Sequence, residues 1–236
     1  MAPLRVCVLV LLLGVCAAVG SSAYSQDVTV GIRNGMVQST VEGDLFYPGL
    51  QFEGAQVRTS LQTGLQVSGV LAVSMSKRFS VQAELQYAQK GAAVRGKWTG
   101  ETCGGPLGDC VIPSLDGTYR MSFVQLPVLL AWHQPVGHGI SLRVLAGPSF
   151  DFLADTRITT ASLRESALPE NALTPMSHQM VGAVGGVEVQ YDVSSGGALQ
   201  FGARYHPALT EIDVVGAEST LRSRAFVLSL GYAFRL

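Results

Sequence analysis

The sequence is poor in charged residues. Asp, Glu, Lys and Arg make up 14% of the chain, compared with roughly 25% in ordinary soluble domains. The 16 basic and 17 acidic residues nearly cancel and leave a formal net charge of −1. The chain therefore lacks the basic excess that is typical of proteins that bind nucleic acids, and we expect no nucleic-acid partner.

Long apolar runs are also missing beyond the first residues. Residues 1–25 have the features of a secretory signal peptide: Arg5 is followed by an apolar run from Val6 to Val19, and small residues follow that run. The run is shorter than the roughly 18 residues that a spanning helix needs, which argues against the alternative of a membrane anchor. We predict a cleaved signal peptide over residues 1–25 and one exported domain over residues 26–236.

Cysteine is scarce as well. Cys7 and Cys16 lie in the predicted signal peptide, so the mature chain keeps Cys103 and Cys110, in the segment CGGPLGDC. An oxidising compartment favours pairing of the two thiols, and we predict a loop disulfide. A two-thiolate metal site is the alternative, but no histidine lies close by in sequence and two ligands are too few for it. Phosphate loops and cofactor motifs are absent, so we expect no metal and no cofactor.

What the chain does have is alternation. Between Leu61 and Met75 every second residue, counted from Leu61, is mainly apolar. The residues between them are mostly glutamine, serine and small residues. The C-terminus repeats this pattern, with an apolar row that runs from Phe226 to Leu236. A period of two indicates β-strands with one apolar face. The first run is far longer than the five or six residues of an average strand, as expected of tilted strands that cross a membrane.

The alternating segments number eight, with connections that are short and long by turns. The predicted strands cover residues 28–38, 61–75, 80–92, 119–132, 139–153, 179–192, 198–207 and 223–235. Short turns on one side and long loops on the other are typical of outer-membrane barrels with both termini on the periplasmic side. The predicted fold is therefore all-β, an eight-stranded antiparallel up-and-down transmembrane β-barrel, because only a closed sheet pairs every backbone group within lipid.

Four segments carry a resemblance to a known family. Residues 84–91 read ELQYAQKG, 123–130 read FVQLPVLL, 146–150 read AGPSF and 203–212 read ARYHPALTEI. In order and spacing these resemble the porin-family outer-membrane β-barrel domain of the PorT-like type, with Gln125 in place of the usual acid and Ala208 where glycine is common. The resemblance implies an eight-stranded barrel in the outer membrane and no single activity.

The candidate site consists of charged residues at the alternate strand positions that face the interior of the predicted barrel. An eight-stranded barrel has a lumen that side chains can just fill, and buried charges need partners. We expect Glu84 and Glu188 to meet Arg143 or Arg204 in a hydrogen-bonded plug. Trp98, in the long loop of the predicted disulfide, is a possible contact for a ligand or partner, or else packs on its own loop.

The expected function is a non-enzymatic integral outer-membrane barrel with a structural, adhesion or interaction role. Such a role includes a part in a secretion or transport assembly. A narrow porin-like channel for small solutes is the first alternative, and a soluble periplasmic carrier the second. No catalytic residue is assigned, since no local motif marks a nucleophile and its base. The expected partners are outer-membrane lipid and other envelope proteins that contact the extracellular loops, and a monomer is favoured.

Overall fold

The computed structural model describes residues 27–42, 55–98, 115–160, 179–193, 196–210, 212–213 and 220–236. The predicted signal peptide, Cys103 and Cys110 lie outside these residues, so the predictions made for them stay predictions. Among the described residues, no helix is long and apolar enough to cross a membrane.

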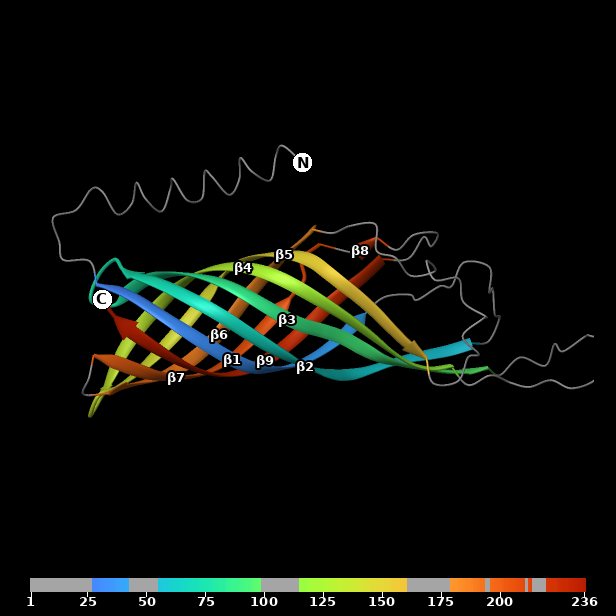
Figure 1. The fold of residues 1–236 in the computed structure, drawn as a ribbon, viewed down its shortest axis with the longest axis horizontal. Helices are drawn as coiled ribbons and strands as arrows, with labels where there is room; N and C mark the ends of the chain where they lie inside the picture. Colours follow the sequence, from blue (N-terminus) through green and yellow to red (C-terminus); the bar gives the residue numbers. More distant parts are fainter. Residues whose placement is uncertain are drawn as a thin grey trace, which may run out of the picture.

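Nine β-strands make up the described part of the chain (Figure 1). Their bounds are β1 Val28–Glu42, β2 Ala55–Ser74, β3 Phe79–Trp98, β4 Leu115–Gly137, β5 Ile140–Thr160, β6 Gln179–Val193, β7 Gly197–Pro207, β8 Ile212–Asp213 and β9 Thr220–Arg235. Eight of them are long and form the wall, and the two-residue β8 pairs only with β9. The eight long strands are the eight that the alternation predicts.

The sheet closes into a barrel. Each long strand pairs antiparallel with the next, and β1 also pairs with β9 along Thr29 to Glu42. This ladder between the first and last strands leaves no open edge among the long strands, which is what a sheet in lipid requires. The predicted eight-stranded antiparallel barrel is confirmed.

The two faces of the wall differ as the alternation predicts. Large apolar side chains point outward and are exposed along every long strand, for example Leu65, Leu85 and Leu230. Polar and charged side chains point into the lumen, where they are buried. This arrangement is the reverse of a soluble protein, and an apolar exterior of this kind is matched by lipid. It argues against the soluble carrier.

The strands of one side of the wall are longer than predicted. β2 to β5 have 20 to 23 residues, about twice what a tilted strand needs to cross the bilayer. Figure 1 shows this side reaching furthest at the end opposite the C-terminus. The apolar alternation fades in these extensions, so the predicted strands fell short: β2 and β4 begin earlier, and β3 and β5 end later, than the alternation predicts.

One aromatic side chain at the end of a predicted strand lies on the inner face. Tyr119 points inward and is buried against Met121 and Phe123. By contrast Tyr87, Tyr191 and Tyr205 are exposed on the outer face, as a girdle residue would be. The register of β4 explains the difference, since residues 119, 121 and 123 share the inward parity.

Candidate functional site

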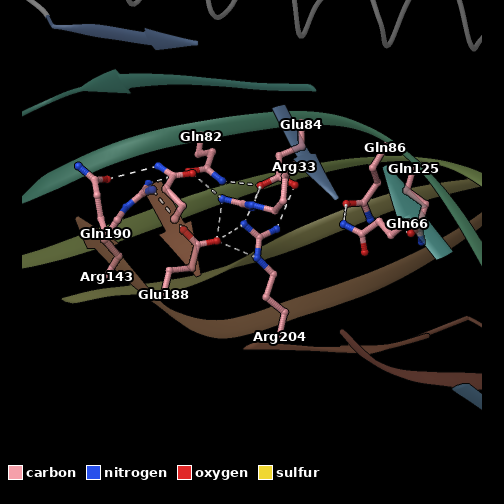
Figure 2. A network of polar contacts seen from close by, with 11 residues as sticks. Arg33, Gln66, Gln82, Glu84, Gln86, Gln125, Arg143, Glu188, Gln190 and Arg204 are labelled. Carbon is pink, nitrogen blue, oxygen red and sulfur yellow. Dashed lines mark hydrogen bonds and ion pairs between the residues drawn. The ribbon is translucent and has the colours of Figure 1, made fainter. Parts of the chain in front are cut away.

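The lumen holds a network of buried charges (Figure 2). Arg33 on β1, Glu84 on β3, Arg143 on β5, Glu188 on β6 and Arg204 on β7 point to a common centre. Their side chains are 0 to 3% exposed. Alternation makes this possible, because each strand contributes its inward residue at the height where the neighbouring strands contribute theirs.

Arg204 is the centre of the network. Its guanidinium donates to both oxygens of Glu84, at 3.0 Å from Nη1 and 2.8 Å from Nη2, and to Glu188 Oε1 at 3.1 Å from Nε. A planar guanidinium suits this role because its donors lie in a fixed fork that matches carboxylate oxygens. Glu84 on β3 and Glu188 on β6 are therefore joined by one arginine from β7, the strand next to β6.

The other two arginines complete the set. Arg33 forms ion pairs with Glu84 at 3.0 Å and with Glu188 at 2.9 Å, and it donates to Gln200 Oε1 at 3.0 Å. Arg143 pairs with Glu188 at 3.2 Å and donates to Gln82 Oε1 at 2.6 Å. All four residues named from the sequence thus lie in one network, together with Arg33. Three arginines face two carboxylates, so the network carries one excess positive charge.

Two further clusters of polar side chains lie in the lumen beside the charged network. The amides of Gln66, Gln86 and Gln125 form a chain, with contacts of 3.0 and 2.7 Å, and appear beside the network in Figure 2. Lys90 pairs with Asp151 at 3.2 Å, and both are buried. Gln125 and Ser149 also donate to Asp151.

Several of these residues were missed by sequence reasoning. Residues 84–91 carry part of the family resemblance and the predicted strand ends at residue 92, so Lys90 was not named among the lumen residues. Since β3 continues to Trp98, Lys90 is an inward residue in mid-strand. Lys90 lies an even number of positions after Glu84 and Gln86, so an unbroken strand places all three on the same face. This spacing was the signal that could have found it.

The histidines lie in different surroundings. His206, near the end of β7, is buried in the lumen, and neither of its ring nitrogens is hydrogen-bonded to a described residue. His133, near the turn between β4 and β5, is half-buried, with Nε2 at 2.7 Å from Ser80 Oγ. His138 does lie in the turn, with a positive φ of 53°.

Metal binding and hydrolysis each need a particular set of side chains close together. In the part of the chain that the structure describes, no three His, Cys, Asp or Glu side chains gather as a metal centre would need. Among the described residues, Ser80 and His133 are placed as a nucleophile and its base would be, with Oγ and Nε2 within hydrogen-bond distance. A catalytic pair also needs a group that orients the histidine, and the charged neighbour of this ring is Arg143, a cation.

Trp98, the contact residue predicted from the sequence, is the last residue of β3 and lies opposite Ala55 of β2.

Residues 24–214 match the family model described as the outer membrane protein beta-barrel domain. No curated protein matches the chain in sequence. Among solved structures, the outer membrane protein OprG of Pseudomonas aeruginosa is 12% identical, with a TM-score of 0.49, over 88% of this chain and 96% of that chain. The outer membrane protein AlkL, solved in DMPC bilayers, is 21% identical, with a TM-score of 0.48, over 92% and 93% of the two chains.

The outer membrane protease OmpT of Escherichia coli is also similar in structure. It is 8% identical, with a TM-score of 0.45, over 89% of this chain and 97% of that chain.

Proposed function

The chain belongs to the outer membrane protein beta-barrel domain family, and we propose that it serves in the bacterial outer membrane as a closed, non-enzymatic barrel with an interaction role on the extracellular side. The observation that carries this proposal is the filled lumen. Five charged side chains from five strands cross it and are 0 to 3% exposed. An eight-stranded barrel has just enough interior for such side chains, so we expect them to block the passage of a solute.

The long side of the wall supports the interaction role. β2 to β5 exceed the length needed to cross lipid, so their far ends stand clear of the membrane. Contacts of membrane barrels are made largely by such projecting strands and their loops. The segment 99–114, between β3 and β4, has Cys103 and Cys110 in its sequence and Trp98 directly before it. This segment is the first place to look for a partner.

The test of the closed lumen is conductance. The protein is refolded in detergent, shown to be folded by heat-modifiable gel migration, and added to a planar lipid bilayer. We expect no steady current from the wild type. A variant with Arg33→Ala and Arg204→Ala, which removes two of the side chains that cross the lumen, is measured beside it and is expected to conduct. Steady, selective current from folded wild type would contradict the closed lumen.

The test of the interaction role uses whole bacteria. Cells that display the wild type are compared with cells that display a Cys103→Ser/Cys110→Ser variant and a variant whose segment 99–114 is replaced by a short glycine-serine turn. Attachment to matrix proteins and to cultured cells is counted. We expect attachment to fall in the shortened variant while the amount of barrel in the membrane is unchanged. Equal attachment by all strains, including one without the barrel, would refute the role.

A narrow channel is the second candidate, and one observation favours it. Several buried polar atoms that line the lumen make no hydrogen bond to a described residue, among them Gln66 Oε1, Ser68 Oγ, Ser229 Oγ and Arg143 Nε. Water is the usual partner of such atoms, and a chain of waters past the network would be a path. The same conductance measurement separates this candidate from the closed barrel.

A further inference from the structure

Two arginines face each other on the outer surface of the wall. Arg120 on β4 and Arg157 on β5 are cross-strand partners in the antiparallel ladder, and both side chains are exposed. Directly opposed residues on one face have their Cβ atoms only about 4.5 to 5.5 Å apart, and like charges at this separation destabilise a sheet. An anion bound between the two guanidiniums would reduce this repulsion.

The neighbours of the pair supply only part of the missing charge. Arg157 Nε donates to Asp155 Oδ2 at 2.9 Å, across side chains that are 80% and 50% exposed. Arg120 makes no hydrogen bond or ion pair with any residue that the structure describes. The carboxylate of Asp155 therefore pairs with Arg157 alone, and the guanidinium of Arg120 is available to an external group.

On the other side of Arg120 the cross-strand partner on β3 is Gly91, which has no side chain that could pair with the guanidinium. Towards the centre of the wall, Tyr87 is 42% exposed, and its hydroxyl donates to Ser122 Oγ at 3.0 Å. An aromatic ring with a polar tip is typical of the border between the apolar band and the headgroups.

The height of the pair agrees with that border. On β4, Trp132 lies near the short turn, and the outward residues between it and Arg120 include Val124 and Leu130, which are exposed and apolar. A rise of about 3.3 Å per residue and a tilt of about 40° place Arg120 roughly 30 Å from Trp132 along the barrel axis. An apolar band is about 25 Å tall, so the pair stands a few ångströms beyond it, at headgroup level.

From this geometry we infer that Arg120 and Arg157 bind the phosphate of an anionic lipid headgroup in the outer leaflet. Arginine forks bind phosphate oxygens in pairs, and a phosphate between the two guanidiniums cancels their repulsion. The lipid's acyl chains then lie along the apolar outer face of β4 and β5. This inference depends on the position of the wall in the membrane and not on a closed lumen, so a conducting barrel would leave it unaffected.

The experiment measures retained lipid on the whole, refolded protein. Wild type, R120Q/R157Q and K77Q/R78Q are prepared in detergent with phosphorylated lipid A, and the fraction of protein that carries one lipid is measured by native mass spectrometry. The control variant also removes two positive charges, but from the short turn at the other end of the barrel. Lipid A without phosphates and free inorganic phosphate are tested in parallel.

We expect wild type and K77Q/R78Q to retain lipid A equally and R120Q/R157Q to bind it about tenfold more weakly. Lipid A without phosphates should not be retained, and free phosphate should not displace the lipid at equal concentration. Equal retention by all three proteins would overturn the inference, as would an equal loss in both variants. Full displacement by free phosphate would show a soluble anion as the ligand and would overturn the lipid assignment. R120Q alone, which keeps the Arg157–Asp155 pair, serves if the double variant does not refold.

Discussion

Substitution of Glu188 by glutamine tests whether charge balance holds the lumen together. The carboxylate pairs with Arg33 at 2.9 Å, with Arg143 at 3.2 Å and with Arg204. Glu188→Gln keeps the shape of the side chain but removes one of the two negative charges that face the three arginines. The buried excess then rises from one positive charge to two.

The expected cost follows from the burial. Removal of one partner from a fully buried ion pair costs about 3 to 5 kcal/mol, because the other partner stays buried without its counter-charge. A barrel whose free energy of unfolding is in the usual range of about 5 to 15 kcal/mol would lose a large fraction of it. We measure the unfolding free energy in urea, with the protein refolded into phosphatidylcholine vesicles and followed by tryptophan fluorescence.

A compensating change separates charge from packing. Gln200 Oε1 accepts a hydrogen bond from Arg33 Nη2 at 3.0 Å and is buried, so Gln200→Glu places a carboxylate against the same guanidinium. We expect the double variant Glu188→Gln/Gln200→Glu to recover a substantial part of the lost stability. The reasoning fails if Glu188→Gln alone costs less than about 1 kcal/mol, or if the added carboxylate recovers nothing.

Three further substitutions give expected outcomes in the same unfolding assay. Asp151→Asn leaves Lys90 without its buried partner and should cost about 3 to 5 kcal/mol; a Lys90→Met/Asp151→Asn protein should lose less. Gly91→Ala places a methyl group 2.0 Å from a backbone oxygen of β4 and should destabilise the barrel by more than about 2 kcal/mol, whereas Gly69→Ala, which meets nothing within 4 Å, should stay within about 0.5 kcal/mol. Leu85→Arg puts a charge on the lipid face, 60% exposed and near mid-membrane, and should cost about 2 to 4 kcal/mol; a cost near zero would mean that this face does not meet lipid.

The fold could be predicted because the bilayer imposes a simple pattern. A wall with lipid outside and a packed lumen inside forces a period of two through each strand, and the row from Phe226 to Leu236 follows it in the structure. The pattern weakens once a strand leaves the lipid, as it does between Ala93 and Trp98. Strand ends in these extensions are set by pairing with a neighbour, which a single sequence does not display.

The site could be predicted in part, for a related reason. Parity placed Glu84, Glu188 and Arg204 on the inward face, and burial of charge then required that they meet. Parity does not give height along the barrel, so it did not show which inward residues share a level. His206 illustrates this limit: it has the inward parity of Arg204, but its place near the end of β7 pointed to the rim.

The buried network also specifies the register of the strands. The outer face of the barrel is apolar along its length, so lipid penalises a slip of two residues only weakly. A slip of two residues moves a strand by about 6.6 Å, and Arg204 would then lie beyond the reach of Glu84 and Glu188. Charges from five strands meet at one point in one register only. We therefore expect that replacing Arg33, Glu84, Arg143, Glu188 and Arg204 together by apolar residues of similar volume would leave a barrel of comparable stability, as buried ion networks often allow. Its amide NMR spectrum, however, should show more than one set of signals for the strands that carried the charges, β1, β3, β5, β6 and β7. One sharp set at native positions would mean that the turns and the remaining side chains fix the register without the charges.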